Sequence, residues 1–509
     1  MAIGERLYSF PGGLKLRHHK QISCQQPLAE AGLPDKLYIP IGQHQGEPGE
    51  LLVKPGDRVL RGQPLTRTLD DFQVPAHAST SGTIESLVDW PAAFPPGSKG
   101  RCLCLVPDGQ DEADSPNPLG NWQDQPTEVL INHLRDLGLA GLGGAMFPTA
   151  AKLRGDWRRI DTLILNGAEC EPWISCDEML MRHRPAAVIE GALVLARAVG
   201  AEHIVIAIED QMGAVEQALN RAKDAIAGAE RVRVVKVTTI YPEGGERQLI
   251  QVLTGMEVPH NGLPQDIGLL CHNVATAAAA RAAVIDGQAL TERIVTITGP
   301  GVKQARNLIT RIGTPVAHLV EQASGYMNDV QRLVLGGPMS GTPLSSDAIP
   351  VTKGSNCILA LTSEELATIQ PTLPCINCGE CVRVCPASLL PQLLYKAVEA
   401  QQHEQASALN LLDCIECGCC AQVCPSHIPL VDWYRHGKDQ LRLKELDTRR
   451  ATLAKRRYEA REARLAQAQK ERQARRERRR EQLQAPDEAQ SEIQAAIKRA
   501  KQRKQGEDS

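Results

Sequence analysis

Two stretches of this chain share one cysteine spacing: Cys375-Ile-Asn-Cys378-Gly-Glu-Cys381-Val-Arg-Val-Cys385-Pro386 and Cys414-Ile-Glu-Cys417-Gly-Cys-Cys420-Ala-Gln-Val-Cys424-Pro425. The spacing C-x2-C-x2-C-x3-C-P is typical of bacterial ferredoxins that bind [4Fe–4S] clusters. Three closely spaced thiolates of each motif ligate one cluster, and the fourth cysteine ligates the other cluster. The sequence therefore predicts a ferredoxin-type double [4Fe–4S] module over residues 365–435.

The same spacing predicts which cysteines share a cluster. One set is Cys375, Cys378, Cys381 and Cys424, and the other is Cys414, Cys417, Cys420 and Cys385. Structural zinc is the alternative, because paired C-x2-C motifs also bind zinc. Zinc needs four ligands per site but does not require this order and its proline twice, so we favour iron–sulfur clusters. Two neighbouring clusters can transfer electrons one at a time between a donor and an acceptor. The rest of the chain has to indicate which donor and acceptor these are.

Composition narrows the class of protein. Of 509 residues, 42% are apolar, which is enough for several hydrophobic cores, and 3% are aromatic. So few aromatic residues argue against nucleic-acid binding by base stacking as the main activity. We find no run of 18 apolar residues and no apolar segment near the start, so we expect neither a membrane-spanning helix nor a secretory signal.

The charge is distributed unevenly along the chain. Residues 438–509 hold 22 Lys and Arg against 13 Asp and Glu, a net charge of +9, so residues 1–437 carry −12. The segment 440–509 has few apolar anchors and predicts a basic tail that is helical or disordered. Contact with anionic lipid or RNA is one interpretation, and a solvated tail without a specific ligand is the favoured one.

Residues 1–115 are rich in Pro, Gly and Val in short alternating runs, which predicts small β structure. The runs 51–65 and 74–84 resemble the two halves of a lipoyl/biotinyl-type barrel-sandwich domain. Carrier domains of that type present a lysine in the intervening hairpin, and residues 66–73 contain none. We therefore expect an unmodified domain.

Residues 125–290 alternate between buried strands and helices, which predicts a parallel α/β sheet. The predicted strands cover residues 161–165, 203–208 and 231–237, and the predicted helices cover residues 127–139, 185–199 and 214–228. Residues 291–350 return to β character.

Polar and glycine-rich segments punctuate this region. The loop Gly138-Leu-Ala-Gly-Leu-Gly-Gly-Ala-Met-Phe-Pro-Thr149 could bring backbone N–H groups close to a phosphate, although it fits neither standard phosphate-loop pattern. The strand at 161–165 continues into Asn166-Gly-Ala-Glu-Cys-Glu-Pro172. Ligands bind beyond the carboxyl ends of such strands. Together with the polar segments 241–247 and 269–276, these residues predict a cleft.

In this order, the segments resemble the RnfC family, which supplies one subunit of the Rnf (Rsx) ion-translocating electron-transport complex. The central part is also similar to the NADH-binding flavoprotein subunit of respiratory complex I, whose GRGGAGFPTGLKW and NADESEPG motifs correspond to residues 141–153 and 166–172. The resemblance implies a multidomain fold that combines α/β and β domains. Its parts are an unmodified barrel-sandwich hybrid domain (1–115), a Rossmann-like FMN/NADH-binding α/β domain (120–290), a β-grasp, soluble-ligand-binding-like domain (291–355), the double [4Fe–4S] module (365–435) and the basic tail (440–509).

The resemblance also implies cofactor-binding residues. Gly141, Gly143, Gly144 and Lys152 would hold the FMN phosphate and ring. Asn166 and Glu169 would bind the flavin, Glu171 the nicotinamide nucleotide, and Phe147 would stack near the adenine or nicotinamide. Glu246, His272 and Asn273 match polar residues of the family, with Thr276 nearby. This chain departs from the flavoprotein pattern at Leu142, Met146, Leu153, Ala168 and His272.

The implied function is that of an oxidoreductase subunit at the cytoplasmic face of the bacterial inner membrane. With two [4Fe–4S] clusters, FMN and NAD(H), it would pass electrons between NAD(H) and ferredoxin or membrane subunits. Membrane contact would be peripheral, and no specific nucleic-acid partner or acid–base catalytic residue is expected. The alternatives are a diaphorase subunit of a soluble hydrogenase or dehydrogenase, and a non-enzymatic iron–sulfur adapter.

Overall fold

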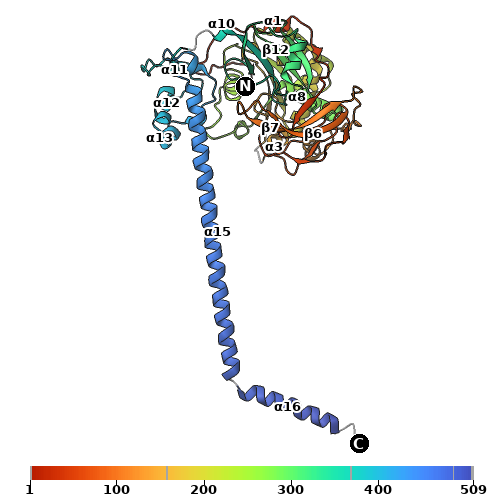
Figure 1. Ribbon diagram of the computed structural model, residues 1–509, viewed down its shortest axis with the longest axis vertical. Coiled ribbons are helices and arrows are strands. Elements are labelled where there is room, and N and C mark those ends of the chain that lie inside the picture. Colours follow the sequence, from red (N-terminus) through yellow and green to blue (C-terminus); the bar gives the residue numbers. More distant parts are fainter. Residues whose placement is uncertain (1–2, 156–158, 367–369, 485, 506–509) are drawn as a thin grey trace. The chain divides into compact units, whose positions relative to one another are not determined.

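The computed structural model describes residues 3–155, 159–366, 370–484 and 486–505 (Figure 1). The ends of the expected 1–115 and 440–509 segments, and short stretches of the 120–290 and 365–435 segments, lie outside the described residues. The chain divides into two compact units, Met1–Arg435 and His436–Ser509. The structure is of mixed α/β class, as expected.

A four-stranded parallel sheet organises the α/β region. Its order is β10-β9-β8-β11, and the strands are β8 (Thr162–Gly167), β9 (His203–Glu209), β10 (Val232–Val237) and β11 (Leu269–Asn273). Strands β8, β9 and β10 lie where the sequence predicts them. Strand β11 is an addition, because its short run Leu-Leu-Cys ends in polar residues and does not stand out as a buried strand.

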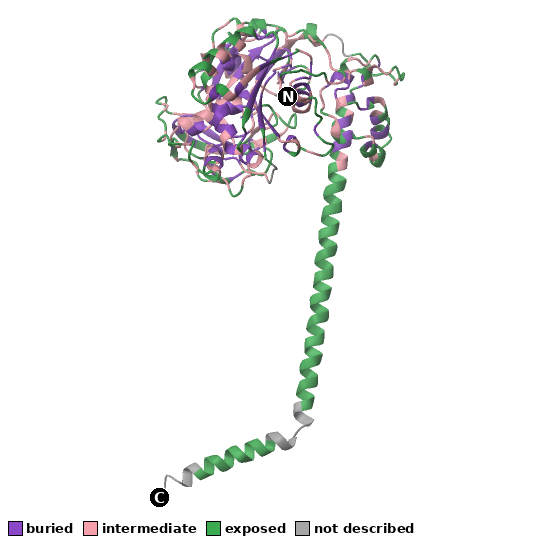
Figure 2. Ribbon diagram, turned by 180° about the vertical axis from the view of Figure 1, so that it is seen from behind, coloured by how far each residue is buried: buried purple, intermediate pink, exposed green. Residues whose placement is uncertain are grey.

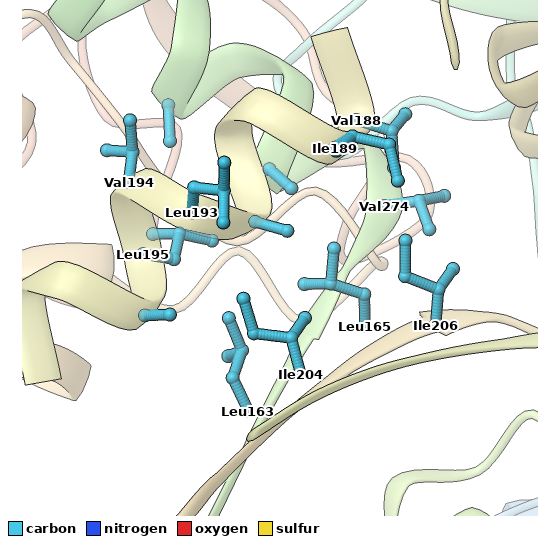
Figure 3. Packing of buried hydrophobic residues seen from close by; sticks show 14 of the residues in the cluster. Leu163, Leu165, Val188, Ile189, Leu193, Val194, Leu195, Ile204, Ile206 and Val274 are labelled. Carbon is cyan, nitrogen blue, oxygen red and sulfur yellow. The ribbon is translucent and has the colours of Figure 1, made fainter. Parts of the chain in front are cut away.

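Each face of this sheet packs on helices. Leu163 and Leu165 of β8 contact one core, and Ile164 between them contacts another, because successive side chains of a strand point to opposite faces. The first core is closed by α2 (Thr127–Asp136), α5 (Pro185–Val199), α6 (Gly213–Ala225) and α8 (Val274–Ile285). Figure 3 shows the part of it between strands β8 and β9 and helices α5 and α8. The second core is closed by α7 (Glu246–Thr254). The carboxyl edge of the sheet lies between these two cores.

Helices α5 and α8 approach closely because small residues face each other. A Cβ added at Gly191 of α5 would lie 1.8 Å from the carbonyl oxygen of Ala277 in α8. Helix α5 begins with Pro185, whose φ suits the first turn, and ends at Gly200 in the left-handed conformation. The contact brings the start of α8, and with it Asn273 and Thr276, against the sheet.

A second, antiparallel sheet lies in the N-terminal region. It has the order β2-β7-β6-β4, with β2 (Leu37–Pro40), β4 (Arg58–Val59), β6 (Gly82–Pro91) and β7 (Lys99–Pro107). Strands β3 (Glu50–Leu51) and β5 (Thr66–Arg67) pair separately. Leu37, Ile39 and Leu105 belong to its shared buried core.

A six-stranded mixed sheet follows the α/β region. Its order is β1-β13-β12-β16-β14-β15, with β1 (Ala29–Glu30), β12 (Glu292–Thr298), β13 (Arg306–Arg311), β14 (Val330–Leu335), β15 (Thr342–Pro343) and β16 (Cys357–Thr362). Helix α9 (Val316–Gln322) packs on it. Strand β1 comes from the N-terminal segment and pairs with β13, so residues 29–30 join this sheet rather than the antiparallel one.

The cysteine-rich region repeats one backbone shape. It contains α11 (Glu380–Arg383), α12 (Pro391–Glu399), α13 (His403–Ala408) and α14 (Cys419–Gln422). Positive φ angles recur 39 residues apart, as the cysteines do, at the pairs Asn377/Glu416, Gly379/Gly418 and Ser388/His427. The two motifs therefore adopt the same fold locally.

The basic tail is helical. Helix α15 spans Leu430–Gln484 and α16 spans Pro486–Gln505. The described side chains of residues 442–481 are all exposed (Figure 2), which agrees with a charged helix that packs on no apolar face. Across the described ranges, no helix has the length and apolar character that a bilayer crossing requires.

The close α5–α8 contact predicts a sharp effect of one methyl group. We expect Gly191→Ala to lower the free energy of unfolding by about 1–3 kcal/mol, because its Cβ has no room beside Ala277. Gly213→Ala at the start of α6 is the control, since its Cβ would meet nothing within 4 Å. Urea unfolding followed by circular dichroism measures both, and equal midpoints would contradict this packing argument.

Candidate cofactor site

Two asparagines face each other across the carboxyl edge of the parallel sheet. Asn166 of β8 and Asn273 of β11 are register partners. Asn166 Nδ2 donates to the Gly244 carbonyl at 2.7 Å. Asn273 Oδ1 accepts from the Ala275 N–H at the start of α8, and its Nδ2 donates to Asp177 Oδ2 at 2.6 Å. The amides hold this edge together and mark its position.

The glycine loop lies against the start of α8. The Gly141 N–H donates to the Phe147 carbonyl at 2.8 Å, which closes residues 141–147 into a compact loop. The Leu142 N–H donates to Thr276 Oγ1 at 2.9 Å. A Cβ added at Gly143 would lie 3.2 Å from Asn273 Cβ, whereas one at Gly144 would meet nothing within 4 Å. The loop apex is thus exposed beside Asn273.

Lys152 and Glu246 meet at the same edge. Lys152 lies on the short helix α3 (Thr149–Leu153), and its Nζ donates to Glu246 Oε1 at 2.8 Å and to the Cys271 carbonyl at 2.6 Å. The neighbouring His272 is buried, and its Nε2 has no hydrogen-bond partner among the described residues. Burial, with Lys152 adding to it, lowers the pKa of His272 well below its usual range, so the ring is neutral.

Glu169 caps the helix α4 (Cys176–His183). Its Oε1 accepts from the Asp177 N–H at 3.1 Å, and its Oε2 accepts from the Glu178 N–H at 3.3 Å. Carboxylates are favoured at helix N-termini. Burial, and then the charge of Asp177, nevertheless raise the pKa of Glu169 to about 8.

A buried lysine balances these acids. Lys20 Nζ lies 2.8 Å from Glu209 Oε2 and also donates to the Glu169 carbonyl oxygen. The Lys20 and Glu209 side chains are 4% and 1% exposed. Although burial acts to lower the pKa of Lys20, the charges of Glu209 and Glu169 raise it. The lysine is therefore charged.

Glu243 adds a further buried acid behind this edge. It is 3% exposed, and its Oε2 has no hydrogen-bond partner among the described residues. Burial raises the pKa of Glu243 to about 8, with the charges of Glu209 and Asp210 adding to the effect. This carboxyl is therefore largely protonated at neutral pH.

Glu171 and Phe147 contact segments that lie outside the α/β region. Glu171 Oε1 accepts from the Ser340 N–H at 2.8 Å, and its Oε2 accepts from the Met339 N–H at 3.2 Å. A Cβ at Gly337 would clash with the same carboxylate. The Phe147 ring packs edge-on against Phe72 of the N-terminal region, 6.4 Å between centroids.

Three cysteines of the second motif share a pocket with one cysteine of the first. Cys385 lines the same pocket as Cys414, Cys417 and Cys420, and Tyr434 lies beside them. The structure thus brings together the four residues of one predicted cluster. Within the first motif, Cys375 and Cys378 lie near Cys381, since their charges add to the rise in its pKa, which burial dominates.

The residues predicted from the sequence thus form two groups. One surrounds the edge of the sheet and consists of Gly141, Gly143, Gly144, Lys152, Asn166, Glu169, Glu246, Asn273 and Thr276. The other, Glu171 and Phe147, contacts neighbouring domains. Lys20, Asp177 and Ser340 join the site but were not predicted. Asp177 lies six residues after Glu171, close enough in the sequence for a local pattern to include it. Lys20 and Ser340 lie far from the other site residues in the sequence, so no local pattern could include them.

The edge has features that suit a flavin mononucleotide. The apex of the glycine loop is open, a lysine lies beside it, and a neutral buried imidazole nitrogen at His272 lacks a partner among the described residues. Backbone N–H groups with a cation suit a phosphate, and amide and carboxyl groups suit ribityl hydroxyls. The residues at this edge therefore fit FMN.

Comparisons with known families match four successive regions of the chain to family models. The RnfC barrel sandwich hybrid domain matches residues 8–110, and the Nuo51 FMN-binding domain matches residues 134–282. The SLBB domain matches residues 294–343, and the 4Fe-4S dicluster domain matches residues 374–428. The expected barrel-sandwich hybrid, FMN-binding and four-iron regions are confirmed at this level.

Two curated relatives match most of the chain. The C subunit of the ion-translocating oxidoreductase complex of Edwardsiella ictaluri is 46% identical over 476 residues, covering 92% of this chain and 59% of the relative. The protein of the same name from Erwinia tasmaniensis is 43% identical over 470 residues, covering 92% and 58%. The chain thus spans about three fifths of the length of these relatives.

A solved structure also resembles part of the chain. It is an NAD+-reducing [NiFe]-hydrogenase in the air-oxidized state, with 21% sequence identity and a TM-score of 0.43. The match covers 58% of this chain and 60% of that one.

The protonated Glu243 predicts a stability difference that depends on pH. Its folded pKa lies above the unfolded value of 4.5, so it stabilises the fold fully below pH 4.5 and loses this contribution as pH rises toward 8. We expect Glu243→Gln to gain stability over wild type from pH 5 to pH 8, by at most about 1.4 kcal/mol per pH unit.

Urea unfolding at pH 5, 6.5 and 8 measures this difference. The exposed Glu230→Gln is the control, and we expect its difference from wild type to stay constant. A Glu243→Gln difference that is equally constant would show that this carboxyl is ionised in the fold.

Proposed function

The chain belongs to the RnfC family of subunits of ion-translocating oxidoreductase complexes, and we propose that it transfers electrons between NAD(H) and other subunits of such a complex. The observation that carries the proposal is the placement of two kinds of site in one compact unit. An edge suited to flavin and eight cysteines in dicluster spacing both lie within Met1–Arg435. An oxidoreductase subunit needs both, because FMN accepts a hydride and releases its electrons singly, whereas iron–sulfur clusters carry one electron at a time.

The domain limits belong to the proposal. We assign residues 1–115 to the barrel-sandwich domain, 120–290 to a Rossmann-like domain, 291–355 to a β-grasp domain, 365–435 to the dicluster domain and 440–509 to the tail. The parallel order of β8 to β11 supports the second assignment. The mixed sheet with α9 on one side supports the third, although β16 extends it to residue 362.

The flavin would lie at the carboxyl edge of the parallel sheet. Gly141, Gly143, Gly144 and Lys152 would bind its phosphate and ring edge, with Asn166, Glu169, Glu246, Asn273 and Thr276 around them. The bond from Lys152 to Glu246 keeps the cation in place before the ligand arrives. The protonated Glu169 would leave the site less negative than its composition suggests, which favours an anionic phosphate.

NAD(H) would approach from the side of Glu171 and Phe147. Both residues contact segments of other domains, Ser340 in one case and Phe72 in the other. A nucleotide between these segments would be shielded from water, as hydride transfer requires.

Each set of four cysteines would hold one [4Fe–4S] cluster. A tetrahedral zinc site has Zn–S bonds of about 2.3 Å, so its sulfurs lie about 3.8 Å apart. Among the described residues, the group whose ligand atoms lie within 4.8 Å of one another is Glu169, Cys176 and Asp177. That group belongs to the edge of the sheet, and the eight motif cysteines, with the x2-x2-x3 order and its proline present twice, suit two four-iron clusters better than zinc.

The partners we propose are the membrane subunits of the complex and ferredoxin. The subunit would bind peripherally at the cytoplasmic face of the inner membrane. No contact with a specific nucleic acid is part of the proposal.

One observation favours a second candidate, the iron–sulfur adapter. Asn166, Asn273 and Lys152 all have hydrogen-bond partners within the protein. An edge held closed by its own side chains would leave the clusters as the working cofactors. This candidate predicts no flavin and no response to NADH.

An anaerobic titration tests the proposal. The chain is reconstituted with iron, sulfide and FMN, and NADH is added while visible absorbance and EPR spectra are recorded. We expect flavin bleaching, then reduced [4Fe–4S] signals and about eight iron per chain, from two four-iron clusters. Clusters that dithionite reduces but NADH does not would favour the adapter.

Lys152→Met tests the site itself. We expect FMN to bind roughly tenfold more weakly or worse, because a charge-assisted contact is lost. Lys54→Met, an exposed lysine of the N-terminal region, is the control and should leave FMN binding unchanged. Equal FMN affinity in the two variants, measured by fluorescence quenching, would contradict the placement of the phosphate.

A further inference from the structure

We propose that the cluster of Cys385, Cys414, Cys417 and Cys420 is the one that takes electrons from the flavin site, through a contact formed by Tyr241 and Met339. We call this the inner cluster, and the cluster of Cys375, Cys378, Cys381 and Cys424 the outer cluster. The inference rests on the proposed function, because it assigns an order to cofactors that the proposal places in the chain.

The first part of the contact is a buried tyrosine. Tyr241 follows β10 at the carboxyl edge of the sheet and is 4% exposed. Its hydroxyl donates to the backbone carbonyl of Cys417 at 2.7 Å, so it reaches a ligand of the inner cluster directly. Its backbone pairs with Leu14 in both directions, at 2.7 and 2.9 Å, which holds the ring in place. Glu171 lies close to the same hydroxyl, because its charge adds to the rise in the pKa of Tyr241 that burial dominates.

The second part is the peptide of Met339. Its N–H donates to Glu171 Oε2 at 3.2 Å. Its carbonyl oxygen lies 2.9 Å from the position that a Cβ of Gly418 would take. The loop between Cys417 and Cys420 therefore packs against the Met339 carbonyl. One residue thus contacts both the proposed nucleotide side and the inner cluster loop.

Apolar packing and hydrogen bonds surround these two contacts. Cys170, Tyr241 and Cys419 form one buried cluster, against which Met339 and Cys417 pack. The Gly13 N–H donates to the Val384 carbonyl at 3.0 Å, next to Cys385. Gln248 Nε2 donates to the Pro386 carbonyl at 3.3 Å. The two accepting carbonyls belong to the residues directly before and after Cys385, a ligand of the inner cluster.

The first motif is placed differently although its backbone is the same. Gly379 occupies the position equivalent to Gly418, with φ angles of 81° and 79°, yet a Cβ there would meet nothing within 4 Å. Cys378, the equivalent of Cys417, is exposed. Ile376 is 67% exposed, whereas its equivalent in the second motif, Ile415, is 37% exposed. The outer cluster therefore faces away from the sheet, at a surface where an acceptor protein can approach.

The electron count fits this order. Reduced FMN gives up two electrons and two protons to return to its oxidised form. The electrons would pass one at a time to the inner cluster, and the first would move on to the outer cluster before the second arrives. Each cluster gains one electron, and both protons leave to solvent.

Tyr241→Phe tests the contact through a property other than turnover. Its hydroxyl donates to the carbonyl of Cys417, a ligand residue of the inner cluster, and loss of this hydrogen bond should lower the reduction potential of the inner cluster and leave that of the outer cluster unchanged. A mediated redox titration followed by EPR, with dithionite as reductant, measures both potentials without NADH. Unchanged potentials for both clusters, or equal shifts, would overturn the assignment.

The two equivalent glycines provide a matched pair. Gly418→Ala and Gly379→Ala impose the same strain at positive φ, but a Cβ at Gly418 also presses on Met339. We expect Gly418→Ala to slow cluster reduction by NADH in stopped-flow measurements far more than Gly379→Ala. Equal rates would contradict the Met339 contact.

Removal of each cluster in turn tests the order. Cys378→Ser should leave an inner cluster that NADH still reduces, whereas Cys414→Ser should leave an outer cluster that dithionite reduces and NADH does not. The opposite pattern would reverse the order. If NADH fails to bleach the flavin of the wild-type protein, the proposed function is wrong, and the dithionite titration of Tyr241→Phe still decides the contact.

Discussion

One buried cation holds the N-terminal segment across the domains of the first unit. Lys20 pairs with Glu209 at the end of β9 and donates to the backbone of Glu169, 149 residues away. A charged lysine that is 4% exposed would be very costly without these partners. A few residues on, Asn307 of the six-stranded sheet donates to the Ser23 carbonyl, and β1 then pairs with β13. The arrangement of the flavin edge depends on this crossing segment.

The polar residues at the edge serve first as structure. Asn273 caps α8, Glu169 caps α4, and Asn166 holds the segment that contains Gly244. Their hydrogen bonds keep the strands and helices of the edge in register. A site built this way is rigid before the ligand binds, which reduces the entropy lost on binding. The protonated acids beside it keep the local charge low.

The dicluster region shows how tertiary contacts make two equal motifs unequal. Both repeat the same turns and the same positive φ angles. Tyr241, Met339 and Gly13 pack against the second motif and the end of the first, so that Cys417 is half-buried and Cys378 is exposed. Such contacts distinguish the two proposed clusters and so set the proposed direction of electron transfer, since the ligand spacing of the two motifs is the same.

The sequence by itself determined the local patterns of this protein. Cysteine spacing within short segments indicated the clusters, and apolar runs of strand and helix length indicated β8, β9, β10 and their helices, because both signals extend over a few residues. Glycine and asparagine motifs also located the edge of the site. Only the tertiary structure decided that Lys20 lies under that edge, that Ser340 covers Glu171, and which cluster faces the sheet. These pairs are joined by burial and hydrogen bonds between distant segments, and no local pattern encodes such contacts.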